Sequence, residues 1–292
     1  MARLSSPYSI SYKSLIPWVV LFLLAGGGIA PAKLSLSVSP PLIETTLVPG
    51  GVRRITVAVT NEGDEDARVT LRLLPFGLSP EGEVVFLNES PYSLLPLMAT
   101  KEKDVFILKA EEKREIPFEI RAPRGEKGGR YGVVLFEALP LNIPSGMAVG
   151  IRMGTLVLAT FPRSSGPKGK IRTVREKDGK IEVEVENTGD VHFAVTEGEA
   201  VLKTEAGKIL KRVNLAGTGL LLPGGMRLLS GELREGFEAP GPCVLEARVY
   251  TRKGNRRLLL DRMSVSYPIE GGEGKKENMD VSVEVLPGNK NK

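Results

Sequence analysis

The sequence predicts an all-β protein built from two tandem β-sandwich domains. Apolar and polar residues alternate with a period of two in one stretch after another, which is the pattern of strands that bury a single face. In addition, the pattern V-x-V-x-N-x-G-D occurs at Val57–Asp64 and again at Val183–Asp190, and Asn187 follows Asn61 by 126 positions (187 − 61 = 126). Because that spacing is the size of one β-sandwich, we expect two of them.

Residues 1–32 are predicted to be a secretory signal peptide. Arg3 and Lys13 are the only charged residues before the apolar run Leu15–Leu24, and Ala30-Pro31-Ala32 has the small residues of a cleavage site. We therefore expect a periplasmic or extracellular protein. The alternative is an uncleaved membrane anchor, although the run is shorter than the ~20 residues of a spanning helix. Membrane contact is expected only through this segment.

The charge balance gives no reason to expect nucleic acid as a partner. Without Arg3 and Lys13 the chain has 38 Lys and Arg against 35 Asp and Glu, a net charge of +3. The basic residues are scattered along the sequence as on an ordinary solvated surface.

Residues 33–162 are predicted to form the first domain. A first strand at Leu34–Val38 is interrupted by Pro40-Pro41, which is tolerated where a strand lies at an edge or switches sheets. The pair around the turn at Asn61 follows, and further strands are expected at Glu83–Leu87, Asp104–Leu108 and Arg114–Ile120, with a loop over Pro91–Met98.

Two long strands close this domain, at Tyr131–Leu139 and Val149–Phe161, and both are apolar on both faces at their centres. Such strands must be covered on both faces, so a second layer is expected over them. The loop between them contains Ile143 and Met147, which is unusually apolar for a solvated hairpin tip.

The linker is placed at residues 163–169, the second domain at 170–269 and a charged tail at 270–292. No stretch of the second domain requires a helix. In the tail, Met279–Leu286 alternates like a strand. It is expected either to fray or pair back on its own domain, or to add to another chain.

Few residues are available for chemistry. The chain has one Cys and one His, which excludes an internal disulfide and a Cys-based metal site. Cys243 fits a small buried hydrophobe and His192 a surface or boundary residue. We find no phosphate loop or nucleophile motif, so we expect no enzyme, cofactor, metal or small-molecule substrate.

The order of these elements resembles the PapD-like periplasmic pilus chaperones, over most of 34–269. The resemblance rests on Leu47–Gly51, the strand ending at Asn61–Asp64, Phe106–Leu108, Pro117–Ile120, the long final hairpin and the Pro-containing linker. It implies immunoglobulin-like domains set at an angle, with the last strand of the first domain lent to a subunit that lacks a strand.

The resemblance also implies that two basic residues hold the subunit's terminal carboxylate, one in the first strand and one in the last strand of this domain. Arg152 matches the second position. The first strand region, Leu34–Val48, contains no Lys or Arg and does contain Glu44, so this chain departs from the family pattern there.

The leading hypothesis is an extracytoplasmic, chaperone-like protein that lends a strand to a protein subunit during assembly of a pilus-like or other surface structure. The candidate partner-binding residues are Arg152, Leu156, Val157, Leu158, Ile143 and Met147. The alternative is a non-catalytic structural or adhesive surface protein, in which the second apolar face is covered by the other domain or by the tail.

Overall fold

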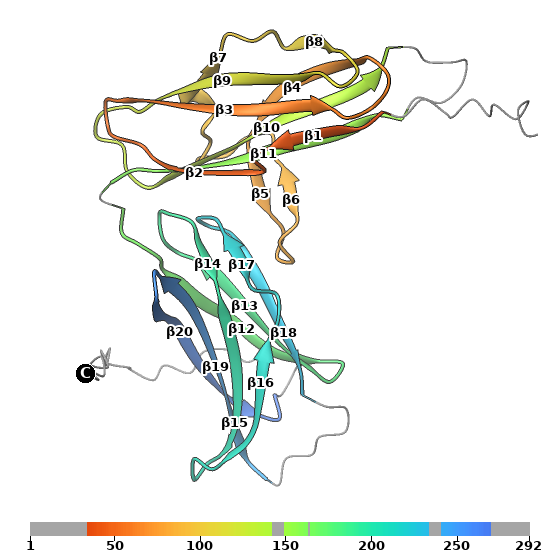
Figure 1. Ribbon diagram of the computed structural model, residues 1–292. Coiled ribbons are helices and arrows are strands. Elements are labelled where there is room, and N and C mark those ends of the chain that lie inside the picture. Colours follow the sequence, from red (N-terminus) through yellow and green to blue (C-terminus); the bar gives the residue numbers. More distant parts are fainter. Residues whose placement is uncertain (1–33, 142–148, 163, 234–240, 270–292) are drawn as a thin grey trace, which may run out of the picture.

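The computed structural model describes residues 34–141, 149–162, 164–233 and 241–269, and these form two successive β-sandwiches (Figure 1). The predicted all-β, immunoglobulin-like fold class is confirmed. The predicted signal peptide and tail lie outside the described residues. Within the described part of the chain, no helix is long and apolar enough to cross a membrane.

The first domain has two facing sheets and a small separate hairpin. Its strands are β1 (Leu36–Ser39), β2 (Leu42–Thr46), β3 (Val52–Asn61), β4 (Ala67–Leu74), β5 (Phe76–Leu78), β6 (Val84–Phe86), β7 (Met98–Thr100), β8 (Val105–Leu108), β9 (Lys113–Arg121), β10 (Gly129–Pro140) and β11 (Ile151–Thr160). One sheet has the order β1-β3-β9-β7, the other β2-β11-β10-β4-β8, and β5 pairs with β6.

The Pro40-Pro41 pair marks a change of sheet, which is one of the two positions expected for it. Before it, β1 pairs antiparallel with β3; after it, β2 pairs parallel with β11 in the opposite sheet. The region predicted as a loop over Pro91–Met98 contains the short 3-10 helix η2 (Leu95–Leu97) and leads directly into β7.

The second domain repeats the sandwich with a different arrangement of strands. They are β12 (Gly169–Lys177), β13 (Lys180–Asn187), β14 (Phe193–Val195), β15 (Glu197–Thr204), β16 (Ile209–Leu215), β17 (Gly219–Leu221), β18 (Met226–Glu232), β19 (Cys243–Lys253) and β20 (Arg256–Tyr267). The sheets have the orders β12-β13-β18 and β16-β15-β19-β20, and β14 pairs with β17. Cys243 is free and buried, as expected.

Along the strands of the repeat, the apolar residues of the alternating pattern point into the core. In the first copy of the repeat Val57 and Val59 are fully buried, and in the second copy Ile181, Val183 and Val185 are fully buried. Each set belongs to the core of its own domain.

The repeated asparagine has the same structural role in both domains. Asn61 and Asn187 are fully buried, and each Oδ1 accepts a hydrogen bond from the backbone N–H two residues later, that of Gly63 or Gly189. Each Nδ2 donates to the carbonyl four residues later, at 2.7 Å in the first domain and 2.8 Å in the second. The side chain therefore holds the turn closed from the inside.

Candidate functional site

The two halves of β11 have different neighbours. From Leu156 to Thr160 the strand lies between β10 and β2, and the Leu156 N–H donates to the carbonyl of Pro41 at 3.0 Å. From Ile151 to Gly154 it pairs with β10 only. β1 also lies near β11, but its backbone pairs with β3 in the opposite sheet. The first half of β11 therefore has an open edge, meaning one along which no described strand is hydrogen-bonded.

The predicted contact residues Leu156, Val157 and Leu158 lie in the closed half. Val157 is fully buried in the core of the first domain. Leu158 is fully buried on the opposite face, in a third apolar cluster to which Leu156 also packs. All three side chains already have partners within this chain, and their role in partner binding stays a prediction.

This third cluster covers the second apolar face of the long hairpin, as the sequence predicted for strands that are apolar on both faces. Tyr131, Val133 and Leu158 of the first domain pack with Phe76 of β5 and with Leu222 of the second domain. The second face of the hairpin is thus covered in part by the other domain.

Arg152 lies in the open half of β11 and is exposed. Its Nε is 2.8 Å from Oε1 of Glu137, whose other oxygen is 2.8 Å from Nε of Arg72, so the three side chains form an ion-paired row across three strands. The predicted residues Ile143 and Met147 lie outside the described residues.

Three apolar side chains near the open edge of β11 were not among the partner-binding residues predicted from the sequence. Val149 is 70% exposed and Met153 is 39% exposed, and Ile151 between them is half-buried. They share the strand face that Val157 occupies farther along. Their signal in the sequence was an alternation with Gly150, Arg152 and Gly154, which the longer apolar run after Gly154 obscured.

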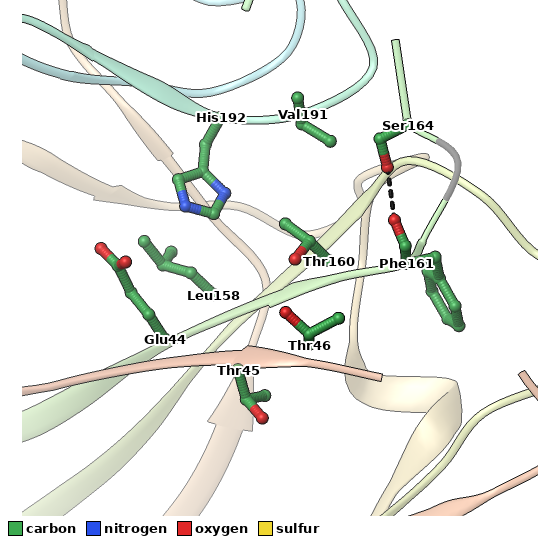
Figure 2. Close-up of a pocket in the computed structure, with 9 residues that line it drawn as sticks. All are labelled: Glu44, Thr45, Thr46, Leu158, Thr160, Phe161, Ser164, Val191 and His192. Carbon is green, nitrogen blue, oxygen red and sulfur yellow. Dashed lines mark hydrogen bonds between the residues drawn. The ribbon is translucent and has the colours of Figure 1, made fainter. Parts of the chain in front are cut away.

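A cleft of about 530 Å³ lies where the closed half of β11 meets the second domain (Figure 2). It is lined by Glu44, Thr45, Thr46, Leu158, Thr160, Phe161, Ser164, Val191 and His192. Among these described residues Glu44 is the only carboxylate, His192 is the only side chain with a basic group, and none is Lys or Arg.

His192 lies at this boundary between the domains. Its backbone N–H donates to the hydroxyl of Tyr131 at 2.8 Å, and its Nδ1 is 3.3 Å from the same oxygen. Burial lowers the pKa of His192, and Glu44, which faces the ring across the cleft in Figure 2, opposes this in part. We therefore expect a neutral imidazole at pH 7, held as a structural contact.

Two further groups of contacts join the domains. The backbone N–H of Gly129 donates to the carbonyl of Asp190 at 2.7 Å. On the far side the N–H of Leu228 donates to the carbonyl of Pro80 at 2.8 Å, and the buried Arg227 packs against Gly82. Pro80 and Gly82 lie in the turn between β5 and β6, which reaches down to the second domain (Figure 1).

These contacts join the two domains. Among the described residues, no three His, Cys, Asp or Glu side chains lie close enough together to hold a metal ion. The open edge of β11 and the exposed side chains beside it are separate from these contacts.

No protein-family model and no curated protein matches this chain. Among solved structures it is similar to the YadV chaperone, with 10% identity, 79% of this chain and 99% of that chain covered, and a TM-score of 0.44. It is also similar to the class 5 fimbriae chaperone CfaA, with 14% identity, 77% and 97% covered, and a TM-score of 0.46.

A third similar structure is the CsuC–CsuE chaperone–tip adhesion subunit pre-assembly complex from archaic chaperone-usher Csu pili of Acinetobacter baumannii. It has 13% identity, 80% of this chain and 97% of that chain covered, and a TM-score of 0.44. The resemblance to divergent pilus chaperones that the sequence predicted is thus found among solved structures.

Proposed function

We propose that this chain is an extracytoplasmic, chaperone-like binding protein that adds the first half of β11 to an incomplete sheet of a protein partner, such as a subunit of a pilus-like surface structure. The open edge at Ile151–Gly154, beside the exposed side chains of Val149 and Met153, carries this proposal. An added strand gains affinity from main-chain hydrogen bonds and specificity from alternate side chains.

The closed half of β11 prepares the open half for this role. Since β2 and β10 hold Leu156–Thr160 on both sides, the backbone direction of the open half is set before a partner arrives. This strand then loses less conformational entropy when a partner binds than a disordered segment would. We expect the exposed side chains of Val149 and Met153 to fill positions in the partner's apolar groove, whereas Ile151 between them packs on the core of the first domain.

The charges around β11 indicate how a partner lies on it. Arg152 and Glu137 keep the opposite strand face polar near the open edge, so only one face of the open half offers apolar side chains. The described residues that line the cleft at the closed end include Glu44 and no Lys or Arg. We expect the contacts of the added strand to supply the affinity.

One observation favours the alternative of a structural or adhesive surface protein. The second face of β11 is covered at Leu158 by Leu222 of the other domain, as that alternative expected. In this case the open edge would have no protein partner, and the exposed side chains at Val149 and Met153 would serve only as surface.

A photo-crosslinking experiment separates the two functions. The chain would carry a benzoylphenylalanine in place of Met153 and, as a matched control, in place of Ile107, which is 51% exposed on the edge strand β8. After irradiation in the native envelope fraction, we expect one adduct at position 153, located by mass spectrometry to a strand of the partner, and none at 107.

The variant Met153→Lys extends this test. We expect it to lose the partner while its melting temperature stays within a few degrees of the unmodified chain, since the side chain is exposed. A monodisperse, folded chain with no adduct at position 153 would instead establish the structural role.

A further inference from the structure

The short strand β6 is an apolar edge that the fold leaves uncovered. β6 pairs with β5 only, in a two-stranded sheet. Its three side chains are all exposed, Val84 at 42%, Val85 at 44% and Phe86 at 45%. Exposed apolar edges are normally shielded because they attract other strands.

The hydrogen-bond register shows which backbone groups of β6 are available. The Ser79 N–H donates to the Glu83 carbonyl at 2.9 Å, and the Leu87 N–H donates to the Pro75 carbonyl at 3.0 Å. Because bonded pairs in an antiparallel ladder recur at every second residue, Val85 bonds to Gly77. The N–H and C=O groups of Val84 and Phe86 consequently point toward the open side.

The edge strand β8 of the same domain provides a contrast. It also exposes apolar side chains, those of Val105 and Ile107. There, however, Arg114 donates from Nη2 to the Ile107 carbonyl at 3.2 Å, and its guanidinium lies 4.7 Å from the centre of the Phe106 ring. This charged side chain shields the edge of β8, and no such contact is found along β6 within the described part of the chain.

The hairpin that contains β6 is fixed at both ends. Phe76 at its base belongs to the apolar cluster between the domains, and its turn is bound by the second domain through Pro80. The open edge is therefore held in one position, which favours binding of a further strand.

The charges around β6 indicate the charge of the strand that would bind there. Glu81 and Glu83 precede it and Glu89 follows it; all three are exposed, and none has an ion pair among the described residues. Antiparallel pairing of β6 with a second copy centred on Val85 would bring the Glu81–Glu83 end of one chain against Glu89 of the other. This repulsion disfavours self-association and favours a strand with positive ends.

We propose that β6 is a second strand-addition site, which binds an extended protein segment with apolar residues at its centre and Lys or Arg at both ends. This site is separate from the open edge of β11. A partner at β6 would contact the hairpin that joins the two domains.

The test uses labelled peptides on the full mature chain, measured by fluorescence anisotropy. The probe is the peptide KKTVTVTKK, and its twin EETVTVTEE has the same centre with acidic ends. We expect the basic peptide to bind to the unchanged chain. Its affinity should fall at least tenfold in the double variant Glu81→Gln, Glu83→Gln, and also at high salt. The control Glu62→Gln, Glu205→Gln removes two exposed carboxylates elsewhere and should change nothing.

A backbone variant tests strand addition directly. Phe86→Pro removes an N–H that faces the open side and leaves the Val85–Gly77 bonds in place, so we expect it to abolish binding, whereas Phe86→Ala weakens it less. Equal binding of the two peptides, or full binding to Phe86→Pro, would overturn the proposal. So would a dimer in sedimentation that the Gln variant strengthens, since this would make a second copy the occupant.

Discussion

The turns at Asn61 and Asn187 have the same sequence pattern and the same buried hydrogen bonds, yet their surroundings differ. In the first domain Nδ2 of Asn61 also reaches the carbonyls of Leu108 and Lys109, at 3.3 and 3.1 Å. In the second domain Nδ2 of Asn187 reaches the Leu221 carbonyl at 3.0 Å. Each asparagine thus connects its turn to a distant segment of the same domain.

Beyond the asparagine the two turns diverge. In the first domain Asp66 accepts a hydrogen bond from the Ala110 N–H at 2.9 Å, within the domain. In the second domain the Asp190 carbonyl accepts from Gly129, and the N–H of His192 donates to Tyr131, across the domain boundary. One turn therefore stabilises a single domain, whereas its repeat also sets how the two domains meet.

The largest effects are expected from Asn61→Asp and Asn187→Asp. Each change keeps the side-chain size but places a carboxylate against backbone carbonyls in a fully buried site. We expect each to lower the free energy of unfolding of its own domain by roughly 3 kcal/mol or more, measured by thermal denaturation. Only the change at Asn187 should also shift the NMR signal of the ring of His192, which is the single histidine of the chain.

The opposite pattern would contradict this comparison. If Asn61→Asp moved the His192 signal as much as Asn187→Asp does, the first turn would be coupled to the domain boundary as well. The measurement needs protein without a histidine tag, so that His192 remains the only histidine.

A smaller effect is expected from Tyr131→Phe. The hydroxyl that accepts the His192 N–H is lost, and a half-buried donor is left without its partner. This should cost about 1–2 kcal/mol and broaden or shift the His192 signal. Tyr92→Phe is the matched control, because Tyr92 packs on the same cluster, whereas the hydroxyl that His192 contacts is that of Tyr131. Similar losses in both variants would argue against the hydrogen bond.

Gly82→Ala is expected to act at the β5–β6 turn. Gly82 has φ +96°, and an added Cβ would collide with the guanidinium of Arg227. Gly207 has φ +82° with open space around it. Gly207→Ala should therefore lower the free energy of unfolding by about 1 kcal/mol, which is the cost of the positive φ without any collision. The difference in melting temperature between the two variants measures the turn's contact with the second domain. No difference would mean that this contact adds no stability.

The repeat and the alternation were sufficient to predict the fold, because a period of two forces one buried face. They also predicted that the strands around Val133 and Leu158 must be covered on both faces. The other domain was one of two covers that the alternative hypothesis named, but Leu222 itself was not identified, since it lies far away in the sequence and joins the cluster of Leu158 only when the domains meet.

The open edge of β11 was missed for a related reason. Within β11 the longest apolar run is Leu156–Ala159, and there the chain itself supplies the partners through β2 and the second domain. Which half of a strand is open depends on where another strand ends. In this chain that end is set by Pro40-Pro41, and β2 begins only opposite Leu156.

The smallest effect expected at the boundary is a dependence on pH. Burial holds the pKa of His192 below its ordinary value of 6.5, so the unfolded chain binds more protons than the folded chain once the pH falls below about 6.5. The free energy of unfolding should therefore decline from pH 6.5 down to the pKa of the folded state. Asp190, whose pKa is lowered through its hydrogen bonds from Ser165 against the effect of burial, contributes only at more acidic pH, below its ordinary 3.8. Denaturation of His192→Gln should show a flat profile between about pH 7 and 5, and a decline equal to that of the unchanged chain would assign the effect to other groups.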